Sequence, residues 1–209
     1  MLFKFHLLLV FVIVTGLPFS RDFSFRENHP SPKKILGWAV QKTSAIRLNG
    51  ATNINNFGCD ITNYTQPDTI FTGENTNSRL VTLTGDLQIG ISKFDCHNKM
   101  MTRDLRKILQ VDQHPVLVIR FLSLERIPEI KNIKDCLKGW VEIELAGCTK
   151  RFEIDYSFET TGTSLIQLNG NRSFSFSDFN LRAPVKFAGL VKVKDKLVVD
   201  FTLLLDPIR

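Results

Sequence analysis

Residues 139–154 read GWVEIELAGCTKRFEI, two alternating runs joined at an Ala-Gly pair. In the first run apolar residues alternate with two glutamates, and in the second Phe152 and Ile154 alternate with charged residues. Successive side chains of a β-strand point to opposite faces of a sheet, so each run predicts a strand with one apolar and one charged face. The stretch therefore predicts an antiparallel hairpin that turns at Gly147.

The same period of two recurs between Gly37 and the C-terminus. It predicts further strands at residues 38–48, 81–91, 117–121 and 197–205. Gly85, inside the second of these strands, predicts a bend. Asn169-Gly170 is the dipeptide most typical of a two-residue hairpin turn, and it predicts such a turn. Residues 194–196 fit either a turn or an exposed continuation of the last strand.

One segment has the period of a helix instead. Met101, Leu105 and Ile108 fall at positions i, i+4 and i+7, and Asn98 precedes them as a candidate N-cap. Alternating antiparallel strands with one short helix, which caps or lines an end, predict a mainly β fold closed into a barrel, because closure leaves no sheet edge unpaired. A barrel of about eight strands has an interior that side chains fill or that holds one slender ligand.

The N-terminal residues 1–20 have the organisation of a secretory signal peptide. One cation, Lys4, precedes an apolar run from Leu7 to Val14, and residues that favour turns follow it. The run is shorter than the roughly 20 residues of a membrane-spanning helix and has the length of a signal-peptide core. We expect a signal peptide at 1–20, a polar leader at 21–36 and a barrel domain at 37–209. The protein would then be exported, to the periplasm or the extracellular space; an uncleaved N-terminal anchor is the alternative.

The four cysteines are Cys59, Cys96, Cys136 and Cys148, and none of them forms a Cys-x-x-Cys pair. In an oxidising compartment an even number of cysteines predicts disulfides, and four cysteines allow three pairings. We favour a Cys59–Cys96 bridge, because Cys136 and Cys148 bracket one predicted strand and would lie too far apart. Four buried free thiols are the alternative.

Four stretches of the chain, residues 37–59, 91–121, 139–154 and 174–181, resemble the YceI-like lipid-binding family. The matching positions are Ser44, Ile46, Leu48, Phe57 and Gly58 in the first stretch, Arg103 and Asp104 in the second, Gly139, Gly147, Thr149 and Lys150 in the third, and Asp178 and Phe179 in the fourth. Across residues 37–205 the resemblance implies an extended, lipocalin-like antiparallel β-barrel. It further implies that the protein is exported and that the interior holds a polyisoprenoid or a similar amphipathic lipid.

The aromatic composition suits an apolar interior, since the chain has 17 phenylalanines and 2 tyrosines. Each methylene that a lipid buries contributes about 0.8 kcal/mol, so an apolar lumen would bind a long hydrocarbon chain. The candidate lipid-binding residues are Ile46, Leu48, Leu83, Leu87, Ile89, Ile91, Met101, Leu105, Ile119, Phe121, Ile143, Phe152, Ile154, Phe174, Phe176, Val199 and Phe201. The alternative is that these side chains simply fill the barrel.

The formal charge of +6 does not by itself indicate nucleic-acid binding. The densest basic run, Lys192, Lys194 and Lys196, alternates with other residues, which favours one exposed strand face over a surface that tracks phosphates. We therefore expect no nucleic-acid partner.

The sequence contains no catalytic triad spacing, nucleophile elbow, phosphate-binding glycine loop or set of metal ligands. We expect a protein that is not an enzyme, has no catalytic residues, metal or cofactor, and carries or sequesters a polyisoprenoid-like or quinone-like lipid. Contact with a membrane surface for lipid exchange, and pairing into a homodimer, are further expectations. The alternatives are an enzyme that acts on a bound lipid and a structural or adhesive secreted β-domain with a filled core.

Overall fold

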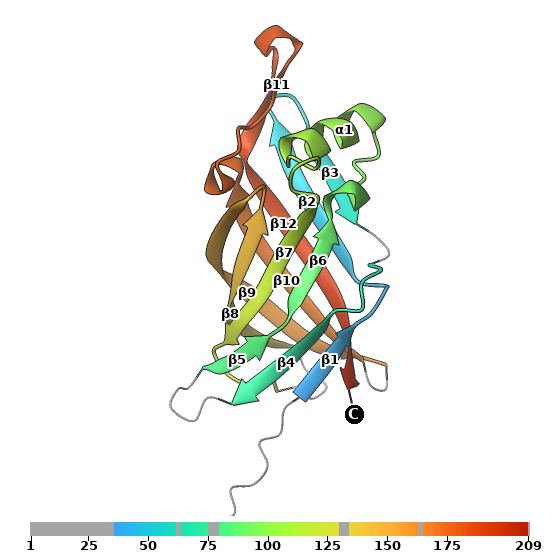
Figure 1. Ribbon diagram of the computed structural model, residues 1–209, viewed down its shortest axis with the longest axis vertical. Coiled ribbons are helices and arrows are strands. Elements are labelled where there is room, and N and C mark those ends of the chain that lie inside the picture. The colour runs from blue at the N-terminus through green and yellow to red at the C-terminus, as the bar shows by residue number, and fades with distance from the viewer. Residues whose placement is uncertain (1–35, 62–63, 75–79, 130–133, 163–164, 209) are drawn as a thin grey trace, which may run out of the picture. The chain divides into compact units, whose positions relative to one another are not determined.

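The computed structural model describes residues 36–61, 64–74, 80–129, 134–162 and 165–208, all within the compact unit Lys33–Arg209 (Figure 1). The predicted signal peptide and nearly all of the predicted leader lie outside the described residues. The leader's last residue, Leu36, is described and begins the first strand.

The described residues form mainly strands. The strands are β1 (Leu36–Val40), β2 (Ala45–Thr52), β3 (Asn56–Ile61), β4 (Thr69–Glu74), β5 (Val81–Thr84), β6 (Asp86–Gly90), β7 (Val116–Leu124), β8 (Asp135–Leu145), β9 (Cys148–Thr161), β10 (Leu165–Ser175), β11 (Val185–Lys186) and β12 (Val191–Ile208). The helices are α1 (Lys99–Ile108) and the short 3₁₀ turns η1 (Ile91–Lys93), η2 (Phe176–Phe179) and η3 (Phe187–Gly189).

The strands close into a barrel. Hydrogen-bonded neighbours follow the order β1-β4-β5-β7-β8-β9-β10-β12, and β12 pairs again with β1, so eight antiparallel strands form the ring within the described ranges. β2 continues along β12 beyond β1, β3 pairs with β2, and β6 continues along β7. A backbone bridge between Asp60 and Asp95 joins β3 to the segment before α1. The predicted fold class, an antiparallel barrel of about eight strands with one short helix, is confirmed.

The hairpin predicted at residues 139–154 is formed by β8 and β9. β8 and β9 pair around Ala146 and Gly147, and Val141, Ile143 and Ile154 are buried while the intervening side chains point outward. The outward glutamates of β8, Glu142 and Glu144, accept hydrogen bonds from Arg120 on β7. One face of each strand therefore packs inside the barrel and the other carries ion pairs.

Two of the predicted strands, 38–48 and 81–91, are each divided in two in the structure. The predicted strand 38–48 is two strands, β1 and β2, separated by a turn at residues 42–43, and both pair with β12. The residues predicted to share its apolar face are nevertheless buried on both sides of the turn, Trp38 in β1 and Ile46 in β2. The bend predicted at Gly85 is confirmed: it separates β5 from β6 and has a φ of +140°.

The hairpin turn predicted at Asn169-Gly170 is wrong. Both residues lie inside β10, where Gly170 pairs with Tyr156 on one side and Phe201 on the other. A Cβ atom at residue 170 would lie 2.0 Å from the ring of Phe201. The glycine is required by a close-packed ring and not by a turn. Residues 194–196 form an exposed continuation of β12, one of the two forms the sequence allowed.

The helix begins where the sequence predicted. The side chain of Asn98 accepts hydrogen bonds from the backbone N–H groups of Met100 (3.0 Å) and Met101 (3.1 Å), which satisfies two donors of the first turn. Among the described residues, no helix combines the length and the apolar composition needed to cross a membrane.

Candidate ligand-binding cavity

An apolar cavity of about 100 Å³ lies inside the barrel. Its wall comes from strands β2, β6, β7, β8, β9, β10 and β12, and from the segments around α1 and η2. Apart from Ser175 and the hydroxyl of Tyr156, every lining side chain is apolar. The lining contains no carboxylate, imidazole, amine or thiol, so the cavity suits an apolar group and offers no obvious general acid or base at neutral pH.

Most of the candidates predicted from the sequence line this cavity. They are Ile46, Leu48, Leu87, Ile119, Phe121, Ile143, Ile154, Phe174, Phe176, Val199 and Phe201. The period of two placed these residues inside correctly, because every second residue of a barrel strand faces the interior.

The remaining candidates lie elsewhere in the interior. Leu83, Ile89 and Ile91 are buried in the core away from the cavity. Met101 and Leu105 line a second cavity between α1 and the neighbouring strands. Phe152 lies beside the wall, with its ring edge-to-face on Phe174 at a centroid distance of 4.8 Å. The pattern predicts which way a side chain points, but not at which level of the barrel it lies.

Several lining residues were not among the candidates. They are Phe94, Leu109, Leu117, Val141, Leu145, Tyr156, Ser175, Phe179, Leu181 and Leu197. Val141 and Tyr156 follow the same alternation as the candidates and could have been found from it. Phe94, Phe179 and Leu181 come from 3₁₀ turns and connecting segments, where the sequence has no strand period.

Two aromatic rings, Tyr156 and Phe201, form one part of the wall, with their centroids 6.0 Å apart. Glycines make room for both: a Cβ at Gly139 would lie 2.7 Å from the Tyr156 ring, and Gly170 stands against Phe201. The Tyr156 hydroxyl has no hydrogen-bond partner among the described residues, and burial raises its pKa. It is therefore a neutral polar group, without a partner among the described residues, in a wall whose other polar side chain is Ser175.

Helix α1 covers the cavity from one end. Leu109, directly after the helix, lines the cavity, and Arg106 donates a hydrogen bond to the carbonyl oxygen of Phe94 (3.0 Å). The predicted disulfide between Cys59 and Cys96 is confirmed, and it ties β3 to the segment that leads into the helix. In the described part of the chain, Cys136 and Cys148 are free thiols.

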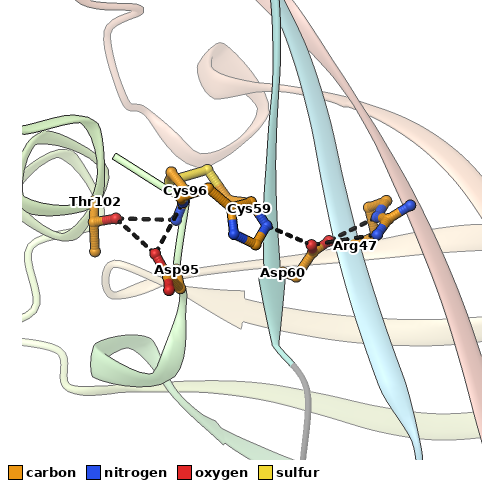
Figure 2. Close-up of polar contacts among 7 residues, drawn as sticks. Arg47, Cys59, Asp60, Asp95, Cys96 and Thr102 are labelled. Atoms are coloured by element: carbon orange, nitrogen blue, oxygen red, sulfur yellow. Dashed lines mark hydrogen bonds and ion pairs between the residues drawn. A yellow bond between two sulfur atoms is a disulfide. The ribbon is translucent and has the colours of Figure 1, made fainter. Parts of the chain in front are cut away.

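Polar contacts on both sides of the disulfide fix the start of the helix (Figure 2). On the helix side, the backbone N–H of Cys96 donates to the hydroxyl of Thr102 (2.9 Å). On the strand side, the carboxylate of Asp60 contacts Arg47 (2.7 Å) and the ring of His97 (2.9 Å). The hydrogen bond from Arg47 is the main reason that the pKa of Asp60 is lowered. These contacts, together with the disulfide, tether the start of the helix to strand β3.

No protein-family model and no curated protein sequence matches the chain. Solved structures do match. A polyisoprenoid binding domain from Saccharophagus degradans has a TM-score of 0.59 and 12% identity, covering 82% of this chain and 98% of that domain. BcnA from Burkholderia cenocepacia has a TM-score of 0.56 and 13% identity, covering 77% and 95% of the two chains. A mutant YceI protein of Campylobacter jejuni has a TM-score of 0.50 and 14% identity, covering 70% and 83%. The chain therefore shares the barrel fold of these three solved structures.

Proposed function

We propose that the protein is an exported, non-enzymatic binding protein that carries or sequesters an amphipathic lipid of the polyisoprenoid or quinone type. The observation that carries the proposal is the cavity wall, which is apolar around almost its whole surface and closed off by a tethered helix. The structural neighbour described as a polyisoprenoid binding domain supports the same ligand class. Export is supported by the disulfide, which persists in oxidising compartments.

The size of the cavity limits how the lipid fits. Sites for drug-sized ligands span about 300–1,000 Å³, whereas this cavity measures about 100 Å³. The open space therefore accommodates one short hydrocarbon segment, and a longer chain enters by displacing lining side chains. A five-carbon isoprene unit buried there would contribute about 4 kcal/mol before the costs of association.

Two measurements test the proposal. The protein is purified from an exporting host under mild conditions, and native mass spectrometry is followed by organic extraction and identification of any bound lipid. A short-chain isoprenoid quinone is then added to ligand-free protein, and the melting temperature is recorded. A co-purifying isoprenoid lipid and a dose-dependent rise in melting temperature are expected. Ligand-free protein that no apolar compound stabilises would contradict the proposal.

The second candidate function is a structural secreted β-domain with a filled core. The small cavity volume is the observation that favours it. The two functions separate in the same experiment, because a filled core gains no stability from an added lipid.

A further inference from the structure

Exposed apolar side chains gather where the β11–β12 hairpin meets α1. Phe187 is 65% exposed and Leu190 75%, both between β11 and β12; Ile54, in the turn between β2 and β3, is 70% exposed. Val185 on β11 and Met100 in the first turn of α1 are also exposed. We call these five residues the apolar tip. Figure 1 shows the β11 hairpin projecting beyond α1 at this end of the barrel.

Hydrogen bonds hold the elements of the apolar tip together. Asn53, next to Ile54, donates from its side-chain amide to the carbonyl oxygen of Leu190 (3.0 Å) and accepts from the backbone N–H of Lys192 (2.8 Å). An ion pair between Lys186 and Asp104 (3.0 Å) joins the hairpin to α1. The apolar tip is therefore a built surface, assembled from three parts of the chain, and not a set of isolated exposed side chains.

The backbone presents the apolar residues outward. Phe187, Ala188 and Gly189 all have positive φ angles, 53°, 52° and 95°. Two consecutive non-glycine residues in the left-handed region carry a conformational cost. The hairpin thus combines an unfavourable local backbone conformation with an exposed phenylalanine and an exposed leucine.

The surroundings of the apolar tip are basic. Lys192, Lys194 and Lys196 are exposed along β12 beside the hairpin, and Lys99 and Arg103 are exposed on α1. Two carboxylates lie among these cations: Asp104 pairs with Lys186, and Asp195 keeps its charge while it accepts hydrogen bonds from Ser177. An apolar tip with a basic border is complementary to a lipid surface that carries negative charge.

A second cavity lies behind the apolar tip, next to the barrel interior. It has a volume of about 230 Å³, and its lining includes Met100 and Phe187 of the tip together with Phe57 and Met101. The buried ring of Phe176 lines both this cavity and the central one. Phe176 is the residue that the two linings share, so it lies between the space behind the apolar tip and the proposed lipid site.

We propose that the apolar tip docks on an anionic membrane surface, with Phe187 and Leu190 inserted among the lipids, and that lipid passes through the second cavity and past Phe176. The biological role of this docking rests on the proposed lipid-binding function. Docking itself is measured without any ligand in the central cavity. A protein partner is the competing occupant, and the test separates it.

The first test locates the inserted residues in the full chain. Phe187→Trp is compared with Ile127→Trp. Ile127 is exposed and lies just after the C-terminal end of β7, the end farther along the chain from α1. Each variant is mixed with vesicles of phosphatidylcholine and about 30% phosphatidylglycerol that contain brominated acyl chains, which quench nearby tryptophans. The signal of Trp38 and Trp140 is subtracted with wild-type protein. Quenching at residue 187 and not at 127 is expected; equal quenching at both positions, or none at 187, overturns the proposal.

The second test measures partitioning. Phe187→Asp/Leu190→Asp is compared with Ile127→Asp/Ile208→Asp, which makes the same charge change at exposed positions away from the apolar tip. We expect the tip pair to bind these vesicles about tenfold more weakly than the control pair, and binding to fall as salt rises. Equal vesicle binding by the two double variants overturns the proposal. It is also overturned if neither double variant binds vesicles and sedimentation shows a dimer that only the tip substitutions abolish.

A thermal shift with a short-chain isoprenoid quinone distinguishes the two proposals. If the tip double variant keeps the rise in melting temperature with quinone but no longer binds vesicles, docking and lipid binding are separate properties. A protein that docks but shows no shift contradicts the proposed function and leaves the docking inference in place.

Discussion

Filling the central cavity with a larger side chain tests whether it is open space. Val141 is buried in the middle of β8, lines the cavity and pairs with Phe121 and Phe152 on the neighbouring strands. An empty cavity costs about 24 cal/mol for each Å³, so the roughly 100 Å³ here corresponds to about 2 kcal/mol. Val141→Phe is expected to place a ring in that space and to raise the free energy of unfolding by up to about 2 kcal/mol.

For a chain of this size, 1 kcal/mol shifts the melting temperature by about 2–4 °C, so the change is measurable by urea and by thermal unfolding. The same substitution should abolish stabilisation by added isoprenoid quinone, because the ring occupies the ligand's place. Val198→Phe is the matched control, since residue 198 lies on the opposite face of β12 from the lining residue Val199. Overpacking a filled core costs about 1–3 kcal/mol. If Val141→Phe lost stability by that amount and still responded to the quinone, the cavity would not be open space.

Three further predictions concern stability. Replacing Cys59 and Cys96 by alanine opens a loop of 37 residues, which should lower the free energy of unfolding by about 4 kcal/mol in chemical denaturation; an unchanged midpoint would show that the bridge does not constrain the chain. Tyr156→Phe removes a buried hydroxyl with no partner among the described residues, so stability should rise by about 1–3 kcal/mol, and a decrease would reveal a hydrogen bond to that hydroxyl. The hydrogen bond from Arg126 lowers the pKa of Asp135 from 3.8 to about 2. The stabilisation is present above pH 4 and is lost as the pH falls through 2, so Asp135→Asn should weaken the dependence of the melting temperature on pH in that range; the same slope in both proteins would count against the ion pair.

The sequence predicted the parts of the fold that depend on local periodicity. Residues 139–154 form the hairpin of β8 and β9 because each strand buries one face, and Asn98 starts α1 because its side chain satisfies free backbone donors. Asn169-Gly170 failed for a physical reason: glycine serves a turn and a close ring contact equally well. Which of the two applies depends on Phe201, about thirty residues further along the chain.

The sequence predicted which side chains face the barrel interior, but not how far along the barrel axis each of them lies. Alternation identified inward residues such as Leu83 and Phe121 equally well, yet only Phe121 lines the cavity. The level of a residue in a barrel depends on the tilt and stagger of the strands, which no single strand encodes. The two-residue strand β11 and the exposed Phe187 after it gave no periodic signal, so the apolar tip was visible only in the structure.

The most direct test of the central claim is a crystal structure of the protein with a bound isoprenoid quinone. We expect continuous density for an apolar chain between β8 and β12, in contact with Val141 and Val199, and a displaced Phe176 ring. Density confined to the outer surface of the barrel, with every lining ring in its unliganded position, would contradict it.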